Sequence, residues 1–389
     1  MLIGIVGAPN KGKSTFFSAI TSIDVDMADY PFTTIKPNTG VTYFTKLCPE
    51  KELGIKCKPK NSMCINSIRH IPITIVDVAG LVPGASLGKG MGNQFLNDLS
   101  AADALIHVVD ISGKTDEFGN PTQNFDSYTE ISMVRNELST WLFEIIKKHL
   151  PSLSKRSDGI FALTEMLSNL KATEQQVKTA ADQANLTLSY ISWEDSGIKK
   201  FSDSFIAINK PYIVVANKLD SSSELKVDEL SRKLNGIKVI GCSSAIELAI
   251  RKAAKSNLIE YERSSNTIKI IGKVDDIQRT GIDYIEKYLK KYNTTGVQEA
   301  INYVISDLLK MVVSYPVENE NKYTDHFGNV LPDAIILNGG ATALDLALHI
   351  HTDIAKRMLY AIDARSKNRL SKEYILKDND IIKIVTAAK

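Results

Sequence analysis

The stretch GAPNKGKST, residues 7–15, decides the fold of this chain. It follows the apolar run LIGIV at residues 2–6 and has the pattern G-x-x-x-x-G-K-S. Its glycines let backbone N–H groups turn inward around a phosphate chain, and the lysine reaches the β- and γ-phosphates. A plain glycine turn between a strand and a helix would not need the Lys-Ser pair at this spacing. We therefore predict a P-loop that binds nucleotide through Asn10, Lys11, Gly12, Lys13, Ser14 and Thr15.

The composition is that of a folded protein, with 43% hydrophobic and 24% charged residues. The length of 389 residues predicts two or three domains. A net charge of +2 argues against a general nucleic-acid coat. No apolar run approaches the ~20 residues that cross a bilayer, and no signal peptide or disulfide scaffold is recognised. We expect a cytoplasmic protein that does not contact a membrane, with a monomer as the simplest state.

The order of apolar patterns predicts an α/β architecture. Short β-branched runs in the first 130 residues return near residues 212–216 and 239–241, as expected of a buried parallel sheet. Glu130–His149 and Ile160–Ala184 have helical spacing. We predict a P-loop NTPase with a doubly wound sheet, an inserted helical hairpin and a small C-terminal α+β domain. The predicted boundaries are residues 1–127 and 206–311 for the sheet domain, 128–205 for the hairpin and 312–389 for the C-terminal domain.

Two further segments are expected near the phosphates. DVAG at residues 77–80 follows a second apolar strand, where Asp77 can hold Mg²⁺ with Ser14 and the Gly80 N–H can meet the γ-phosphate. The loop YPFTTIKP at residues 30–37 offers Thr33 or Thr34 as a switch threonine for Mg²⁺. Each segment alone could be an ordinary turn or a proline-bounded loop, and their order after a P-loop strengthens the prediction.

The base-reading elements follow two later strands. In NKLD, residues 217–220, Asp220 can accept hydrogen bonds from guanine N1–H and the exocyclic amine, which adenine does not offer. Asn217 would tie the base to the P-loop, and Lys218 would lie along the ring. Ser244 and Ala245 follow the next strand, where the Ala245 N–H would meet guanine O6. A small-molecule kinase shares the P-loop but needs none of these residues.

These five motifs resemble those of the Obg family of translation-associated GTPases, most closely the YchF branch in its archaeal form. The resemblance covers nearly the whole chain and is carried by APN at 8–10, YPFTTI at 30–35, DVAGLVPGA at 77–85 and GKGMGN at 88–93. HTDIA at residues 351–355 is similar to the TGS domain of that family, a β-grasp module. The resemblance implies Mg²⁺-dependent GTP hydrolysis. It favours Thr34 over Thr33, so that Lys13, Thr34 and Gly80 become the predicted catalytic residues and Ser14, Thr34 and Asp77 the metal ligands.

Two positions bear on nucleotide choice and rate. Many members of the YchF branch carry a glutamate in the base-reading motif and accept ATP, whereas Asp220 here favours GTP and leaves ATP preference as the alternative. Leu81 occupies the place of the water-orienting glutamine of Ras-like proteins. Because leucine cannot polarise water, we expect slow intrinsic turnover that depends on phosphate positioning. In some related GTPases an asparagine at the position of Asn10 helps bind K⁺; the alternative is that Asn10 only braces the loop.

Several other residues carry weaker signals. Cys48, Cys57 and Cys64 are nine and seven residues apart, unlike the paired cysteines of a zinc ribbon. We expect free or buried thiols in an extended β-hairpin, and a metal site with His70 is the alternative. His107 lies inside an apolar strand and is expected to be a hydrogen-bonded core residue.

The C-terminal domain suggests a partner. It carries the basic residues Lys356, Arg357, Arg365, Lys367, Arg369, Lys372 and Lys377. Such a set is either a solvated face or a surface that faces RNA, and the resemblance favours the ribosome. Two hypotheses remain, a GTP/GDP switch with true turnover and a ribosome- or RNA-binding module with incidental hydrolysis.

Overall fold

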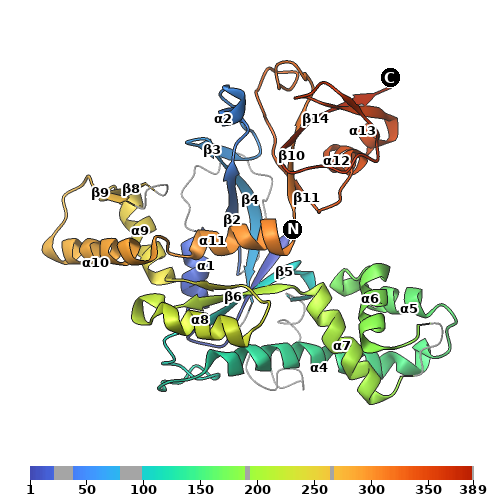
Figure 1. Ribbon diagram of the computed structural model, residues 1–389, viewed down its shortest axis with the longest axis horizontal. Coiled ribbons are helices and arrows are strands. Elements are labelled where there is room, and N and C mark those ends of the chain that lie inside the picture. Colours follow the sequence, from blue (N-terminus) through green and yellow to red (C-terminus); the bar gives the residue numbers. More distant parts are fainter. Residues whose placement is uncertain (22–37, 79–98, 189–192, 263–266, 388–389) are drawn as a thin grey trace. The chain divides into compact units, whose positions relative to one another are not determined.

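The computed structural model describes residues 1–21, 38–78, 99–188, 193–262 and 267–387 (Figure 1). The chain forms two compact units. The first comprises residues 1–26, 34–40 and 74–300, and the second comprises residues 27–33, 41–73 and 301–389. Thr34, Gly80 and Leu81 lie outside the described residues, as does Thr33.

A sheet with the strand order β2-β4-β1-β5-β6-β7 forms the centre of the P-loop fold, and β3 pairs with β4 beyond it. Strands β1, β5, β6 and β7 belong to the first unit, whereas residues 41–47 of β2, all of β3 and residues 68–73 of β4 belong to the second. β1 pairs in parallel with β4 and with β5, and the parallel pairing continues through β6 to β7. All seven residues of β5 are buried, because helices cover both faces of such a sheet. The predicted doubly wound P-loop fold is confirmed. The strands are β1 Leu2–Val6, β2 Thr39–Leu47, β3 Met63–Ile65, β4 Ile68–Asp77, β5 Ala104–Asp110, β6 Tyr212–Asn217 and β7 Val239–Gly241.

The helices of the first unit connect these strands. α1 packs against α9, and α8 packs beside β7. Their bounds are α1 Lys13–Thr21, α8 Glu224–Lys233, α9 Ser244–Lys255 and α10 Asp276–Tyr292, with a small ribbon of β8 Ile259–Glu262 and β9 Thr267–Ile270 between the last two.

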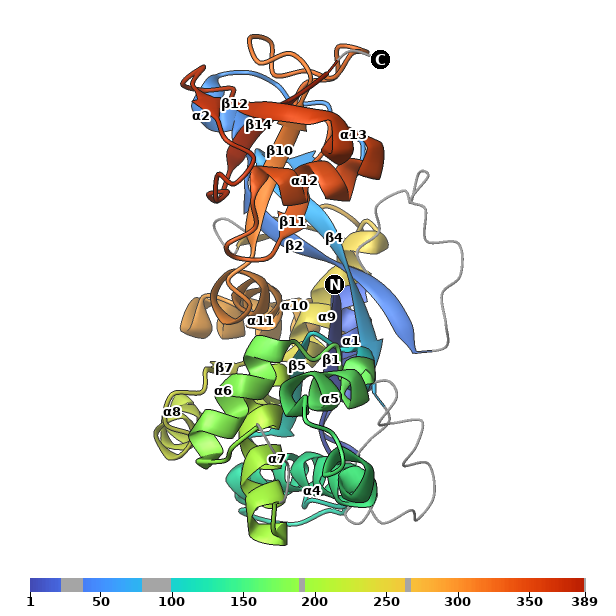
Figure 2. The same cartoon turned by 90° about the vertical axis from the view of Figure 1, so that its right-hand side faces the viewer.

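A group of helices stands where the sequence predicts a two-helix hairpin. Figures 1 and 2 show α4, α5, α6 and α7 gathered together in green, with bounds Ser127–Leu153, Gly159–Met166, Glu174–Ala184 and Asp195–Asn209. The expected second helix is broken because Lys171 is left-handed, with φ 56°, and Thr173 then starts α6 with a capping box to Gln176. Leu142 and Ile146 of α4 share one apolar core with Phe201 of α7.

The second unit combines a hairpin with the C-terminal domain. Its sheet has the order β11-β10-β14-β12-β13, in which β10 and β14 are parallel and the pairs β10–β11, β12–β13 and β12–β14 are antiparallel. α12 Ala343–Ile350 and α13 Thr352–Arg357 pack on this sheet and bury Leu346, Ala347 and Ala355. This is the β-grasp arrangement that was expected. The strands are β10 Val312–Val317, β11 Ile335–Leu337, β12 Met358–Asp363, β13 Arg369–Leu370 and β14 Asp380–Thr386, after α11 Val297–Tyr303 and a π-helical turn, Val304–Leu308.

Candidate nucleotide-binding site

The P-loop connects β1 to α1 in a conformation that requires glycine. Gly7 has φ 144°, and a Cβ there would lie 2.3 Å from the carbonyl oxygen of Val108. Gly12 has φ 90°, and a Cβ there would lie 2.3 Å from Nδ2 of Asn217. Asn10 between them is also left-handed, with φ 61°. Strand β1 can therefore enter α1 through a tight loop whose N–H groups point inward.

Three polar side chains converge beside this loop. Lys13, the first residue of α1, is 9% exposed, and its Nζ donates to the carbonyl oxygen of Ala8 at 2.8 Å. Burial lowers the pKa of Lys13, an effect that Asp77 and Glu130 oppose. Ser14 Oγ donates to Asp77 Oδ2 at 3.3 Å, and burial raises the pKa of Asp77 against the influence of Lys13. Thr15 follows in the first turn of α1.

The pair of Ser14 and Asp77 fits a divalent cation. Oδ1 of Asp77 is buried and has no hydrogen-bond partner among the described residues. A hydroxyl and a carboxylate are the oxygen ligands that Mg²⁺ uses beside nucleotide phosphates. The residues present therefore suit the ion that the sequence predicts.

Asn217, at the end of β6, joins three loops. Its Nδ2 donates to the carbonyl oxygen of Lys11 at 3.0 Å. Its Oδ1 accepts hydrogen bonds from the N–H and the hydroxyl of Ser244, at 3.1 and 2.8 Å. The side chain is 3% exposed. The P-loop and the start of α9 are thus held at a fixed separation by one buried amide.

The next residue, Lys218, is oriented by an aspartate that sequence analysis did not identify. Lys218 Nζ donates to Asp110 Oδ2 at 2.9 Å and to the carbonyl oxygen of Asn10 at 2.8 Å. Asp110 ends β5 and is fully buried; burial opposes its ionisation, but hydrogen bonds from Ser112 and Lys218 lower its pKa. An acid at the end of a buried strand was the signal that could have revealed this partner.

Asp220 and the N-terminus of α9 form the remaining part of the site. Ser243 Oγ donates to Asp220 Oδ1 at 2.5 Å and accepts from the N–H of Ile246 at 3.4 Å, so it also caps α9. Ala245 lies exposed in the first turn of this helix, where backbone N–H groups lack intrahelical partners. The Asp220 carboxylate and the exposed Ala245 of the first turn of α9 therefore both lie close to Ser243.

A buried carboxylate behind the P-loop is the second residue that sequence analysis missed. Glu130 of α4 accepts from the N–H of Ala8 at 2.7 Å, and its Oε2 lies 3.1 Å from Lys11 Nζ. Lys11 and Glu130 are both fully buried, and Nε2 of His107 lies 3.7 Å from Oε1 of Glu130. Burial opposes ionisation of Glu130, but His107, Lys11 and the Ala8 N–H lower its pKa. The side chain of Lys11 therefore points toward α4. His107 is a core residue, as expected, but its Nε2 has no hydrogen-bond partner among the described residues.

Three family models match parts of the chain. Residues 2–148 match the 50S ribosome-binding GTPase family, residues 215–319 the G4 motif-containing domain of Obg-like GTPases of the YGR210-like type, and residues 327–386 the TGS domain. The GTP-binding protein MJ1332 of Methanocaldococcus jannaschii is 47% identical over 395 aligned residues, which cover 100% of both chains. The chain belongs to the Obg-like GTPase family, in its YchF branch.

Other relatives of this YchF-branch protein support the assignment. A GTP-binding protein of Schizosaccharomyces pombe is 31% identical over 88% of both chains, and a protein of Bacillus subtilis named ribosome-binding ATPase YchF is 29% identical over 76% of this chain and 78% of its own. The crystal structure of a GTP-binding protein from Pyrococcus horikoshii OT3 has 37% identity and a TM-score of 0.81, with full coverage of both chains. The S. pombe YchF GTPase structure, at 21% identity and TM-score 0.59 over 99% and 97%, shares the fold.

Membership in this family supports a P-loop nucleotide hydrolase, and enzymes of this kind generally use Mg²⁺. Among the helices of the described residues, none has both the length and the apolar character of a membrane span.

Glu130→Gln should destabilise the first unit strongly. The change leaves Lys11 as a buried charge without its counter-ion, which costs about 3–5 kcal/mol in comparable sites. Urea unfolding followed by tryptophan fluorescence and circular dichroism would measure the loss. Asp195→Asn, which removes the partner of exposed Lys147, is the matched control and should leave the unfolding midpoint nearly unchanged.

The pH dependence of the free energy of unfolding gives a second test of the role of Glu130. Because the pKa of Glu130 is lowered in the folded protein, its contribution is complete above the ordinary glutamate pKa and is lost as pH falls below it toward the folded value. The wild-type protein should lose stability on acidification more steeply than the Gln variant. If the free energy of unfolding falls equally with decreasing pH in the two proteins, this role of Glu130 is contradicted.

Proposed function

We propose that this protein hydrolyses GTP to GDP and phosphate and works as a slow nucleotide-dependent switch. The observation that carries the proposal is the buried amide of Asn217, which holds the P-loop and the start of α9 together beside Asp220. A phosphate loop and a base-reading carboxylate fixed at one separation suit a purine nucleoside triphosphate. Enzymes that need no guanine do not require this connection.

Asp220 supports GTP over ATP, although several bacterial relatives are named ribosome-binding ATPases. Guanine offers N1–H and an exocyclic amine to a carboxylate, whereas adenine would leave Asp220 without its partners. An unpaired polar group at a binding site costs about 1–3 kcal/mol. The hydroxyl of Ser243 holds one oxygen of Asp220 and so orients the carboxylate before nucleotide binds.

The chemistry follows from Lys13, Ser14 and Asp77. We propose that Lys13 exchanges its bond to Ala8 for the β- and γ-phosphates, and that Ser14 and Asp77 hold Mg²⁺. The ion would neutralise charge between the phosphates. Thr34 would complete the ion's ligands, and the Gly80 N–H would contact the γ-phosphate. Turnover should be slow because Leu81 offers no group to orient water.

The role of Asn10 has two versions. Its Nδ2 donates to the carbonyl oxygen of Gly119 at 2.9 Å, which supports a bracing role. The amide oxygen is the atom that would ligate K⁺ in the alternative version. Comparing hydrolysis in KCl with hydrolysis in NaCl at equal ionic strength separates the two, because only the K⁺ version requires faster turnover in KCl.

We further propose that the protein is a cytoplasmic monomer whose C-terminal domain meets the ribosome or structured RNA. Two of the basic residues already have partners inside the second unit: Arg365 pairs with Glu52 at 3.0 Å, and Lys367 donates to the carbonyl oxygens of Glu320 and Ala364. Lys356 and Lys377 are exposed, as is Arg369, whose guanidinium lies 3.7 Å from the ring centroid of Tyr360. A guanidinium that lies flat on an aromatic ring offers a planar face on which a nucleobase can stack.

GTP should bind at least ~10-fold more tightly than ATP, the equivalent of one lost polar pairing. Asp220→Asn should shift preference toward xanthine nucleotides, because the amide then donates where the carboxylate accepted. Titration of fluorescent nucleotide analogues measures both effects. Asp228→Asn, an exposed aspartate of α8, is the control and should keep the wild-type ratio. Equal GTP and ATP affinities in the wild-type protein would refute the guanine assignment.

Lys13→Ala and Ser14→Ala should abolish Mg²⁺-dependent hydrolysis, because they remove a phosphate charge partner and an ion ligand. Leu81→Ala should change turnover little, since leucine takes no part in the chemistry. Phosphate release under single-turnover conditions, with and without ribosomes, is the measurement. A loss in the Leu81 variant as large as in the Lys13 variant, with folding intact, would overturn the proposed role. Equal rates with and without ribosomes would favour a binding module with incidental hydrolysis.

Replacing Lys356, Arg369 and Lys377 by Gln together should weaken ribosome association without changing GTP affinity. Each lost phosphate contact should lower, by about one, the slope of the logarithm of the binding constant against the logarithm of the salt concentration. The control replaces three exposed lysines of α10, Lys287, Lys290 and Lys291, by Gln and keeps the charge change equal. Co-sedimentation across a salt series measures both. If the two triple variants bind alike, the contact lies elsewhere, and helices α4 to α7 become the next candidates.

A further inference from the structure

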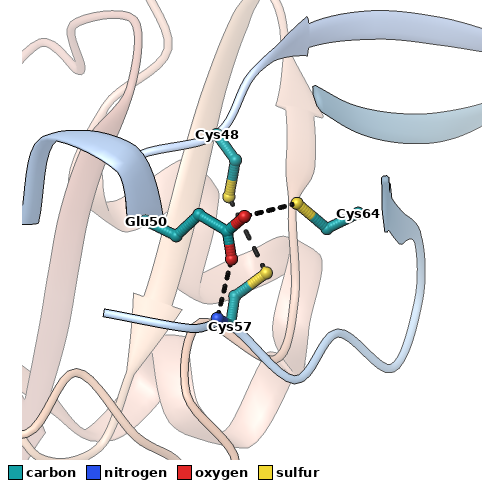
Figure 3. A group of neighbouring side chains, drawn as sticks. All are labelled: Cys48, Glu50, Cys57 and Cys64. Atoms are coloured by element: carbon teal, nitrogen blue, oxygen red, sulfur yellow. Dashed lines mark hydrogen bonds between the residues drawn. The ribbon is translucent and has the colours of Figure 1, made fainter. Parts of the chain in front are cut away.

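Three cysteines and a glutamate meet in the hairpin of the second unit (Figure 3). Cys48 directly follows β2, Glu50 is the first residue of α2 (Glu50–Leu53), Cys57 lies in the following loop, and Cys64 belongs to β3. Figure 3 shows the four side chains pointing toward one another from these four places. One potential ligand atom from each lies within 4.8 Å of all the others.

The distances match a four-coordinate metal. A tetrahedral zinc ion with Zn–S bonds of ~2.3 Å holds its sulfur atoms ~3.8 Å apart, and a carboxylate oxygen lies slightly closer. Sγ of Cys48 and Sγ of Cys57 are 3.9 Å apart, and Sγ of Cys64 is 3.3 Å from Oε1 of Glu50. All three cysteines are free thiols, so no disulfide accounts for their approach.

Hydrogen bonds within the hairpin help to position the four ligands. Asn66 and Ser67 both have positive φ, 50° and 59°, which is the two-residue type I′ turn that pairs β3 with β4. The Cys48 N–H then donates to the carbonyl oxygen of Ser67 at 2.8 Å, and the Cys57 N–H donates to Oε2 of Glu50 at 2.8 Å. The hairpin therefore brings together cysteines that are far apart in sequence.

A buried arginine gives an independent indication that the cluster is anionic. Arg69 of β4 is fully buried, and its NH1 nitrogen lies 3.8 Å from Sγ of Cys57. Its second terminal nitrogen donates to the carbonyl oxygen of Leu331, while Nε has no partner among the described residues. Three thiolates and one carboxylate around a divalent cation leave an excess of negative charge. A buried guanidinium beside one sulfur offsets that charge.

We propose that Cys48, Glu50, Cys57 and Cys64 bind one Zn²⁺ ion. Three soft thiolates in a closed tetrahedral set select zinc over the hard cations Mg²⁺ and Ca²⁺, which prefer oxygen. With four protein ligands and no open position, the site is structural. The fourth ligand is Glu50, and His70, the residue considered from the sequence, is absent from the cluster.

The ion would stabilise a segment that docks on the C-terminal domain. Directly after Cys57, the Lys58 N–H donates to the carbonyl oxygen of Val330 at 2.8 Å, and the Lys60 N–H donates to that of Pro332 at 2.7 Å. Both bonds lie within the second unit. Fixing Cys57 reduces the entropy lost when these backbone bonds form.

The test begins with metal analysis of the full-length chain, purified without a metal-affinity tag. We expect about one Zn²⁺ per chain. Replacing Zn²⁺ by Co²⁺ should give thiolate-to-cobalt charge-transfer bands and the intense visible absorption of a tetrahedral site. Cys57→Ser and Cys64→Ser should lose most of the metal, and Glu50→Gln should weaken affinity at least ~10-fold. Chelation should speed hydrogen exchange of the Lys58 and Lys60 amides and leave β6 unchanged.

Matched variants separate ligand loss from general damage. Cys242→Ala removes the one cysteine outside the cluster, and Glu52→Gln removes a neighbouring carboxylate that pairs with Arg365; both should keep Zn²⁺. Wild-type cobalt spectra remain decisive even where a cysteine variant fails to fold. A chain without stoichiometric zinc whose cobalt spectrum lacks thiolate bands would overturn the proposal. So would iron in place of zinc, or a Cys48–Cys57 disulfide found by mass spectrometry.

Discussion

The three hydrogen bonds of the Asn217 side chain are the constraint on which the nucleotide site depends. They connect the end of β6, the P-loop and the first turn of α9, and none of these segments adjoins another in sequence. The amide fits there because Gly12 has no side chain: a Cβ would lie 2.3 Å from Nδ2. In the proposed function, phosphate positioning and base reading would therefore both depend on one contact, and a larger residue at Gly12 would disturb both together.

Buried charged side chains hold the segments around the Asn217 side chain in place. Lys11 and Glu130 stabilise the loop from the side of α4, and Asp110 holds Lys218 against the carbonyl oxygen of Asn10. Ion pairs of this kind add little net stability compared with apolar packing, but breaking one leaves an uncompensated charge. They act here as positioning elements. The P-loop and residues 217–220 are thus held in place by the protein itself, so in the proposed function binding energy would not be spent on ordering these two segments.

Motif residues could be predicted from the sequence, whereas their supporting residues could not. A P-loop and NKLD have fixed local spacing, so Lys13 and Asn217 are recognisable without a structure. Glu130 and Asp110 act through contacts that span 122 and 108 residues. No local pattern marks Glu130, and only its place at the end of a buried strand marks Asp110. The cysteines are free thiols at a hairpin, as expected, but the sequence did not reveal that Glu50 joins them, because turns and not a short knuckle bring the four side chains together. Hydrophobic periodicity does not reveal a helix break such as the one at Lys171, because the break depends on a single residue with a left-handed backbone.

The second unit is assembled from residues 41–73 and 301–389, and the order of synthesis gives this division a consequence. The hairpin leaves the ribosome long before the backbone carbonyls of Val330 and Pro332 exist to accept its N–H groups. At ~5–20 residues per second the delay is roughly 15–50 s, longer than most small domains need to fold. During that interval the nascent hairpin has its own turn, its own side chains and the pairing of β4 with β1 to hold it, but not the backbone acceptors of the C-terminal domain. Because the C-terminal part of this unit is made last, the three thiols of the hairpin must be kept from oxidation before the unit is complete.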